Sequence, residues 1–524
     1  MHALELVLGL LVPVAALAVL ARRLGIPYPI LLVLGGLALG LVPGLPRVEL
    51  DSEIVFLLFL PPLLYVAAFF TSMRDFRANA HAISQLAVGL VLATTAVVAV
   101  VAHAAIPGLP WPVAFLLGAI VSPTDAITAT AVIQRLGAPR RLVTILEGES
   151  LINDATALVA YRAALAAALT GSFSLGDAGL RFAIALGGIA VGLLVALPIE
   201  QLRRRINDPP VEIVISLLTP FAAYLPAEEL GLSGVLAAVA AGLYLGQRAS
   251  SLMEAETRLS GRAVWDTLVF VLNGLVFILI GLQLPGILAG LAGRGAAELL
   301  ALGGLVSLTV VAVRLVWVGL ARLVAALLGG AARAEPWPVV LVIGWAGMRG
   351  VVSLATALAL PTALPSGQPF PERDLLVFLT FCVILVTLVG QGLSLPWVMR
   401  RLGVGGDGSD QIEEQQARAA ATEAAVARIE QLADEWPGHL PLIDALRGQY
   451  AHRRSHLGES LEPDGAQADP AAEQELLEHR AIRQAIIDAE RRAVLELFAR
   501  GVLHDDIRRR IERDLDLEEV RMEA

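Results

Sequence analysis

The sequence is poor in charge, has a single cysteine and contains no lysine. Only 17% of its 524 residues are charged, whereas 56% are hydrophobic. A water-soluble domain carries about 25% charged residues, so the composition excludes one large soluble domain. The lone cysteine, Cys382, excludes a disulfide within the chain. All basic groups other than histidine are arginines, and we attach no functional weight to that bias.

Two further absences narrow the function. The chain has no His-Glu-x-x-His pattern, and its histidines lie mostly outside the long apolar runs, so a membrane-embedded enzyme using Glu147 and Glu149 is disfavoured. No basic stretch precedes the first apolar run, which we interpret as a true first span rather than a signal peptide. We therefore expect no enzymatic activity, no cofactor and no nucleic-acid partner.

Long apolar runs are what the sequence has in abundance. Runs of about 18 or more apolar residues predict membrane helices, with the lipid bilayer as their surroundings. The predicted fold is all-α and polytopic, with about thirteen transmembrane helices. The segments are 3–20, 26–43, 53–70, 83–106, 112–134, 142–169, 180–201, 210–225, 231–247, 264–287, 297–328, 337–361 and 375–399.

The arginines between these segments test the count. Loops after odd-numbered segments carry 14 arginines and loops after even-numbered segments carry 4, leaving out the tail and the arginines inside segments. Arginine-rich loops stay on the cytoplasmic side of a membrane. The asymmetry predicts a cytoplasmic C-terminus and an external N-terminus, as an odd number of spans requires.

Residues 404–524 differ from the apolar part, 1–403. Residues 405–524 hold 27 acidic and 15 basic side chains, a net charge of −12, which leaves 22 acidic and 24 basic side chains in 1–404. Gln411–Ala433 and Ala471–Arg500 show helical spacing, and Gly458–Pro470 is typical of a linker. We predict a helical cytoplasmic tail that regulates the membrane domain; a small helical bundle with no ligand of its own is equally consistent.

The densest polar group lies in the fifth and sixth segments. Asp125 sits near the middle of the fifth segment, just after Pro123, which removes a backbone donor and disfavours helix at Ser122. Acidic groups at membrane depth usually face a cavity and carry function, and irregular backbone there lines a cavity or is buried in protein. A helix broken at Ser122–Asp125 therefore predicts an ion site.

The sixth segment adds carboxylates at helical spacing. Ser150 and Asp154 are four residues apart and share one face, while Glu149 and Asn153 form a second stripe about 100° round the helix. Sodium and lithium are hard cations and prefer such oxygen ligands. One carboxylate that holds either a proton or a cation is enough to couple two opposite fluxes. Alternatively, Asn153, Ser150 and Thr124 could merely bond helices together.

Glu149 needs a cationic partner if it is buried. The first candidate is Arg349, between the glycines of Gly344–Gly350 in the twelfth segment; Arg314 and Arg162 are alternatives. Segments five and twelve are the two clearly interrupted ones, and their odd offset makes them run in opposite directions. This arrangement predicts inverted repeats whose broken helices meet at the binding site.

These residues also resemble a known family. Ser122–Asp125, Glu147–Asp154 and Gly347–Gly350 are similar to motifs of the monovalent cation:proton antiporters, in their NhaP/NHE branch of sodium/proton exchangers, here in bacterial form. Leu60–Pro62 and Val389–Gly392 match as well. The resemblance covers roughly residues 1–400 and, more loosely, the tail.

The resemblance implies thirteen helices with inverted repeats, a core and a dimerisation domain, a homodimer in the plasma membrane, and alternating access. Carried over residue by residue, the resemblance implies that Asp154 is the essential ion- and proton-binding carboxylate and that Asn153 is the neutral neighbour typical of electroneutral exchange. It also implies that Ser150, Asp125 and Thr124 contribute to the ion site, and that Glu149 and Arg349 form a structural salt bridge.

Two departures concern ion selectivity. Relatives often have an acid at the position of Val66, so one oxygen ligand is missing, and Ala126 stands where many have proline. The predicted function is an electroneutral sodium/proton antiporter, with sodium (or lithium, or potassium) bound at Asp154, Asp125, Ser150 and Thr124. A potassium/proton antiporter on the same scaffold is the first alternative, and a channel or sensor with the tail as its output is the second.

Overall fold

The computed structural model of the chain describes most of its length. The described residues are 2–42, 55–171, 175–206, 208–291, 293–329, 335–405, 409–459, 470–500, 507–508, 511 and 514–519. The chain divides into two compact units, Met1–Asp407 and Gly408–Ala524, each of which is described by itself below.

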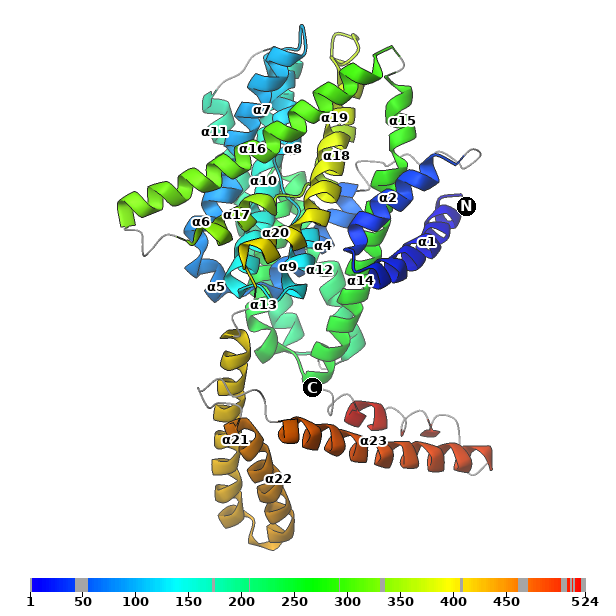
Figure 1. The fold of residues 1–524 in the computed structure, drawn as a ribbon, viewed down its shortest axis with the longest axis vertical. Helices are drawn as coiled ribbons and strands as arrows, with labels where there is room; N and C mark the ends of the chain where they lie inside the picture. The colour runs from blue at the N-terminus through cyan, green and yellow to red at the C-terminus, as the bar shows by residue number, and fades with distance from the viewer. Residues whose placement is uncertain are drawn as a thin grey trace. The chain divides into compact units, whose positions relative to one another are not determined.

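The first unit, here called the membrane unit, is built from helices, and the described residues form no β-strand beyond one isolated bridge between Ala363 and Pro369. The predicted all-α class is confirmed for the described residues. In chain order (Figure 1) the helices are α1 (His2–Leu24), α2 (Tyr28–Gly40), the π-helical turn η1 (Val55–Phe59), α4 (Leu60–Phe70), α5 (Met73–Ala78), α6 (Ala80–Ser84), η2 (Gln85–Leu90), α7 (Val91–Ala105), α8 (Trp111–Val121), α9 (Ala126–Arg135), α10 (Arg140–Thr170), α11 (Leu175–Arg203), α12 (Pro209–Glu229), α13 (Gly234–Leu252), α14 (Ala255–Leu282), α15 (Leu284–Ala289), α16 (Ala296–Gly329), α17 (Trp337–Trp345), α18 (Val351–Leu358), α19 (Arg373–Leu385), η4 (Val386–Gln391) and α20 (Gly392–Leu402).

Each predicted segment lies on one helix or on helices in series, although residues 43, 53 and 54 lie outside the described residues. Arg47, Arg333 and most of the predicted linker at 458–470 lie outside them too. Among the described residues, seven helices or series are long and apolar enough to cross a membrane by length and composition. Helix α2 and the series η1–α4 are apolar but shorter, and α10 carries several charged residues, including its buried acids, so thirteen crossings stays a prediction.

Both predicted interruptions are present. The first break, Ser122–Asp125, separates α8 from α9, and the second break, Ala346–Gly350, separates α17 from α18. At the first break Pro123 has no N–H to continue the helix. At the second, Gly347 and Gly350 lie so close to neighbouring side chains that a β-carbon would collide with Arg314 at the former and with Asp125 at the latter.

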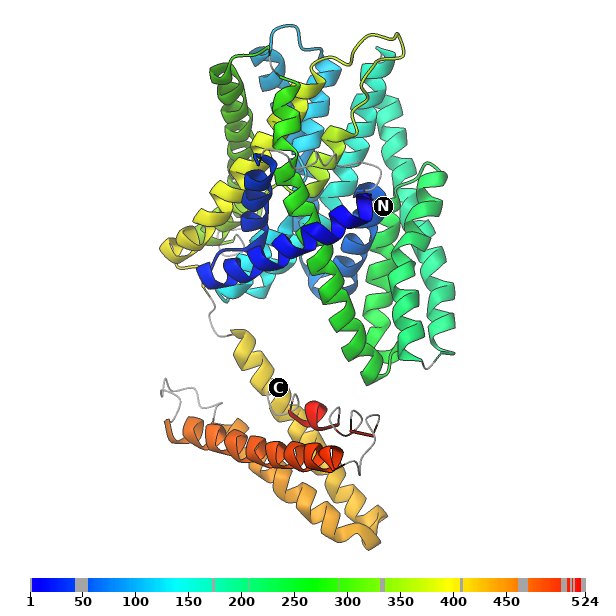
Figure 2. The same cartoon turned by 90° about the vertical axis from the view of Figure 1, so that its right-hand side faces the viewer.

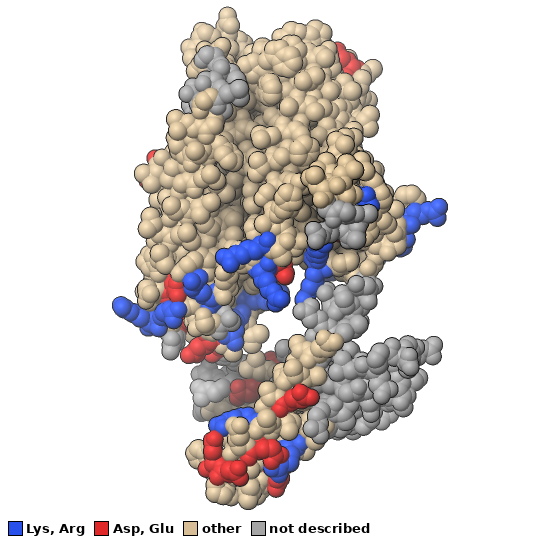
Figure 3. Space-filling view, turned by 90° about the vertical axis from the view of Figure 1, so that its left-hand side faces the viewer, with Lys and Arg blue, Asp and Glu red and all other residues tan. Residues whose placement is uncertain are grey.

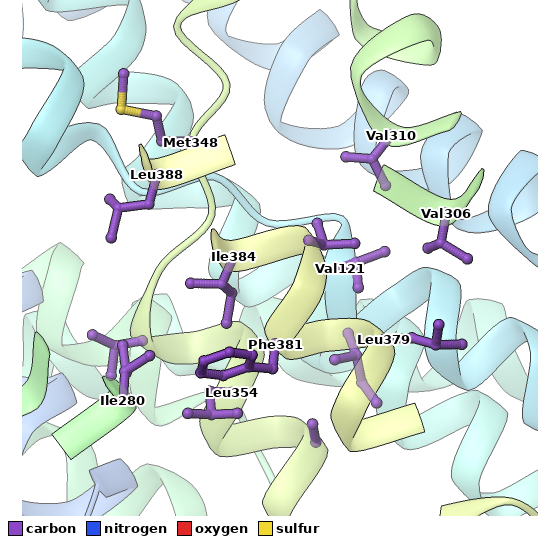
Figure 4. Close-up of a cluster of buried hydrophobic side chains, with 14 of the residues drawn as sticks. Val121, Ile280, Val306, Val310, Met348, Leu354, Leu379, Phe381, Ile384 and Leu388 are labelled. Atoms are coloured by element: carbon purple, nitrogen blue, oxygen red, sulfur yellow. The ribbon is translucent and has the colours of Figure 1, made fainter. Parts of the chain in front are cut away.

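An apolar core surrounds the two breaks. Figure 4 shows Leu354 of α18 beside Phe381 and Ile384 of α19, with Val121 and Met348 from the ends of the breaks. Lipid tails are as apolar as these side chains, so close van der Waals packing rather than removal from water holds such helices together. The breaks are thereby fixed in a dense environment.

Helices α11, α12 and α13 pack against one another and form a bundle, teal to green in Figure 2, at one side of the membrane unit. Helix α4 packs on α13 and α12. Tyr65 of α4, Ala223 of α12 and Trp265 of α14 belong to the apolar cluster between these helices. The bundle gives the unit a second packed region, distinct from the core around the breaks.

The surface of the membrane unit fits a bilayer. Leu327 and Leu328 at the end of α16 are 85% and 86% exposed, which is tolerable where lipid is the solvent. Figure 3 shows a broad surface nearly free of charged side chains, with arginines gathered toward one end of the unit. This is the pattern expected of a protein that crosses a membrane.

The second unit contains α21 (Ser409–Glu435), the 3-10 turn η5 (Pro437–His439), α22 (Leu440–Glu459) and α23 (Pro470–Ala499). Helices α21 and α22 pack side by side (Figure 1), and Arg447 of α22 forms an ion pair with Glu430 of α21, Nη2 to Oε2 at 2.8 Å. Helix α22 was not predicted from the sequence, because its charged and apolar residues show little helical periodicity.

Candidate functional site

The first break is held in place by polar side chains of α10. The backbone carbonyl oxygen of Thr124 accepts a hydrogen bond from Ser150 Oγ at 3.1 Å and another from Asn153 Nδ2 at 3.1 Å. Residues three or four apart on a helix share a face, which is why both side chains reach the same carbonyl. The spacing noted in the sequence therefore serves to support the non-helical backbone.

The Thr124 hydroxyl is engaged as well. Its Oγ1 donates to Glu149 Oε1 at 2.9 Å and accepts from Asn153 Nδ2 at 2.7 Å. Both oxygens of Thr124 therefore form hydrogen bonds to the protein. In this arrangement Thr124 and Asn153 position the break, and the Thr124 hydroxyl keeps one lone pair with which it could coordinate a cation.

Asp125 ends the first break and begins α9. Its carboxylate Oδ1 accepts the Ile127 N–H at 2.8 Å, the usual arrangement of a helix N-cap. Its own backbone N–H donates to the carbonyl oxygen of Met348 at 2.8 Å, so the two breaks touch directly. The carboxylate lies against Gly350, where any larger side chain would collide with it.

The prediction that Arg349 pairs with Glu149 is wrong. Glu149 forms its ion pair with Arg314 of α16, with Nη2 to Oε2 at 2.8 Å and a second close contact between Nη1 and Oε1. The two side chains are 2% and 0% exposed, so this is a fully buried pair. Arg314 Nε also donates to the Ile343 carbonyl at 3.1 Å.

Arg349 instead donates hydrogen bonds to backbone carbonyls of the two breaks and of the end of α8. Its Nε donates to the Val121 carbonyl at 3.0 Å and its Nη2 to the Ser122 carbonyl at 3.5 Å, while Nη1 contacts the Gly347 carbonyl. The first two carbonyls are left without helical partners where α8 ends, and a cation is favourable at a helix C-terminus. Arg349 therefore caps the helix of one break from within the other.

A cavity of about 650 Å³ adjoins the first break. Four acidic side chains contribute to its wall, and no arginine or histidine does so among the described residues. The polar lining residues are Tyr28, Thr124, Asp125, Thr130, Gln134, Glu147, Ser150, Asp154, Asp266, Asn273 and Ser353. A low-dielectric cleft lined by charge of one sign concentrates counter-ions, so this cavity favours cations.

Asp154 is a buried acid in the wall of the cavity. It is 6% exposed and lines the cavity, and no hydrogen bond to its carboxylate occurs within the described part of the chain. The structure thus brings Asp154, Asp125, Ser150 and Thr124 together at one cavity. Asn153 and Glu149 lie behind them and do not line it.

Val66 of α4 and Ala126 at the start of α9 both line the cavity, where their side chains supply no oxygen. Asp266 and Asn273 on α14, and Ser353 on α18, are among the polar lining residues that were missed in the sequence. Asn273 could have been noticed as a lone amide within a long apolar run. The relation of the other two to the site depends on tertiary packing, which no local pattern reveals.

The donor set fits a singly charged hard cation. Two carboxylates and a hydroxyl provide hard oxygen ligands, which alkali cations prefer over nitrogen or sulfur. Among the residues that the structure describes, no group of three or more His, Cys, Asp or Glu residues suited to a metal ion is found. The site therefore lacks the ligand-rich cluster that structural zinc would need.

Comparison with known proteins agrees with this geometry. The family model for the transmembrane part of sodium/hydrogen exchangers matches residues 9–401. An uncharacterized Na(+)/H(+) exchanger of Mycobacterium tuberculosis is 39% identical, over 99% of this chain and 97% of that protein. A sodium, potassium, lithium and rubidium/H(+) antiporter of Bacillus subtilis is 36% identical, over 71% of this chain and 57% of that protein.

Among solved structures, the sodium proton antiporter MjNhaP1 from Methanocaldococcus jannaschii at pH 8 has a similar fold. The TM-score is 0.59 at 22% sequence identity, and the match covers 77% of this chain and 99% of that one. The family model spans residues 9–401, a range that contains both breaks and the residues of the acid-lined cavity. The chain belongs to the sodium/hydrogen exchanger family of cation/proton antiporters.

Proposed function

We propose that this chain exchanges sodium for protons electroneutrally, using one carboxylate site with Asp154 at its centre. The observation that carries the proposal is the contrast on α10: Glu149 is paired with Arg314, while Asp154 lines the acid-lined cavity with no hydrogen-bond or ion-pair partner among the described residues. A buried carboxylate is stable either protonated or beside a cation, and unstable when bare. Occupancy by proton and by cation is therefore mutually exclusive.

Electroneutrality follows from the residue beside Asp154. Asn153 donates hydrogen bonds to both Thr124 oxygens through Nδ2, a role that a carboxylate cannot fill. A neutral side chain here leaves one exchangeable charge at Asp154. One sodium replaces one proton, and the transport cycle moves no net charge.

The cavity opens toward the arginine-rich end of the unit. Phe70 at the end of α4, Gln134 beside Arg135, and Asp266 beside Arg262 line it and are exposed. Arginine-rich loops favour the cytoplasmic side, so we assign this end to the cytoplasm and the state to an inward-facing one. Transport then needs a second state that is open outward, in a plasma-membrane protein with thirteen spans, an external N-terminus and a cytoplasmic tail.

We further propose a homodimer, with the tail from residue 404 onward as a regulator of the membrane domain from 1 to 403. Potassium/proton exchange is the second candidate. The Bacillus subtilis relative is named for sodium, potassium, lithium and rubidium, and Val66 contributes no charged ligand to this cavity. A site with fewer fixed charges discriminates less strongly between alkali cations.

Proton flux in proteoliposomes tests the proposal. The purified chain is reconstituted with an internal pH indicator, and sodium, lithium or potassium is added outside. We expect alkalinisation or acidification that follows the sodium gradient, is insensitive to membrane potential, and is lost in Asp154→Asn. Flux of cations without proton movement would instead identify a channel, and larger rates with potassium would establish the second candidate.

A further inference from the structure

Asn273 is a polar residue of the cavity that the structure leaves without a partner. It lies on α14 and is 1% exposed. Among the described residues, neither its Oδ1 nor its Nδ2 has a hydrogen-bond partner of good geometry, and the Tyr28 hydroxyl is a neighbouring polar group. A buried amide left unpaired costs about 1–3 kcal/mol, so such a group normally meets a water, an ion or a ligand.

The position of Asn273 links it to the ion site. It lines the same cavity as Asp125 and Asp154 but comes from a helix that packs on α2, α4 and α18 rather than on α9. The part of the wall contributed by α4 is apolar: Leu60, Leu63, Leu64, Val66, Ala67 and Phe70. Asn273 therefore supplies a neutral oxygen where the neighbouring helix supplies none.

Ser353 shows the same combination of features. Its Oγ is buried and without a hydrogen-bond partner, and it lines the cavity from α18. It lies three residues after Gly350, against which the Asp125 carboxylate packs. Two residues with buried, unpartnered neutral oxygens thus line a cavity whose charged groups are acids.

We propose that Asn273, with Ser353 beside it, is a cation ligand that determines affinity and selectivity in the inward-facing state. This inference rests on the cation/proton exchange proposed above. Asp125 and Asp154 supply the negative charge, and the amide and hydroxyl oxygens replace water in the shell of the ion. Because both added ligands are neutral, they change which cation binds and how tightly, and leave the number of exchanged charges unaltered.

The test compares Asn273→Ala and Ser353→Ala with the control Thr94→Val in the full-length protein. Thr94 also has a buried, unpartnered hydroxyl, but it does not line the cavity. Half-saturating concentrations of sodium, lithium and potassium are measured from proton flux in proteoliposomes. We expect Asn273→Ala to raise the sodium value about tenfold, corresponding to about 1.4 kcal/mol, and to change the sodium-to-potassium ratio. Thr94→Val should match the unaltered chain.

A second measurement does not require reconstitution and therefore also tests a variant that reconstitutes poorly. Melting of the detergent-solubilised protein is followed in sodium chloride and in choline chloride at equal ionic strength. Stabilisation by sodium should be present in the unaltered chain and in Thr94→Val, and absent or much smaller in Asn273→Ala. Unchanged half-saturation, cation ratio and sodium stabilisation in Asn273→Ala would overturn the inference. Absence of cation-driven proton flux in the unaltered chain would instead overturn the proposed exchange itself.

Discussion

Two sets of charged side chains lie inside the membrane unit, and they differ in whether the protein satisfies them. Glu149, Arg314 and Arg349 are saturated by one another or by backbone carbonyls. Asp154 has no protein partner in the described part of the chain, and Asp125 has the single backbone bond of a helix cap. The saturated set holds the breaks in shape, while the unsatisfied set is available to a substrate. Position in the sequence does not separate them, because Glu149 and Asp154 share one helix.

The largest expected effect comes from neutralising the unsatisfied acid. Asp154→Asn should reduce cation-driven proton flux at least about a hundredfold and leave the melting temperature in choline chloride equal or higher, because a buried charge without a partner is removed. Flux assays and melting curves on the same preparation check both statements. A variant that loses stability along with flux would place Asp154 in the structural set.

Removing one member of the saturated set should have the opposite signature. Arg314→Ala leaves the Glu149 carboxylate buried and unpaired, a change that costs about 3–5 kcal/mol. We expect much reduced yield of folded protein and a lower melting temperature. The double variant Glu149→Leu with Arg314→Met should recover most of the stability, since two matched apolar groups replace the pair. Failure of the double variant to recover would show that Glu149 also acts through Thr124.

A smaller effect is expected at the second break. Arg349→Lys keeps the charge but loses the planar fork that reaches several carbonyls at once. We expect a loss of about 2 kcal/mol in stability, in line with lost hydrogen bonds to a charged group, and exchange reduced about tenfold. Melting and flux are measured as above. Wild-type behaviour would mean that charge alone suffices to cap α8.

The smallest effect is expected in the second unit, where ion pairs are exposed. Arg447 and Glu430 are 40% and 55% exposed, and exposed pairs contribute little to stability. Glu430→Gln should leave exchange unchanged and only slightly increase hydrogen exchange in α21 and α22.

The same pair predicts a pH dependence. The hydrogen bond from Arg447 holds the pKa of Glu430 below its ordinary value of 4.5. The contribution of the pair is therefore present above pH 4.5 and is lost as the pH falls through the lowered pKa. The protection factors of amides in α21 and α22, which correct for the intrinsic pH dependence of hydrogen exchange, should be constant between pH 7 and 5 and fall at lower pH. A change near neutral pH would point to another group.

The sequence predicted the helical class and both breaks because their causes are local. Pro123 interrupts α8 by lacking an N–H, and the glycines of the second break permit its unwound backbone. The acids of the cavity were found for the same reason, since an acid in an apolar run stands out. Asp154, Asp125 and Ser150 can therefore be predicted as site residues from the sequence alone.

The rest depended on contacts that no local pattern encodes. Glu149 and Arg314 are 165 positions apart, and the choice between Arg314 and Arg349 is decided by which carbonyls the first break leaves free. Arg349 donates hydrogen bonds to those carbonyls, and α16 places Arg314 beside Glu149. Asn273 was not predicted as a site residue, because its lack of a hydrogen-bond partner among the described residues depends on how the surrounding helices pack.

The hydrogen bonds between the two breaks give the membrane unit a mechanical property. The Asp125 N–H bonds the Met348 carbonyl, and Arg349 Nε bonds the Val121 carbonyl, so each break is fastened to the other in both directions. The two breaks are therefore coupled to each other by hydrogen bonds that run in both directions. For the proposed exchange, we expect a cation bound at Asp125 and Asp154 to move together with both breaks, and the contacts that change to be those made to α4 and α14.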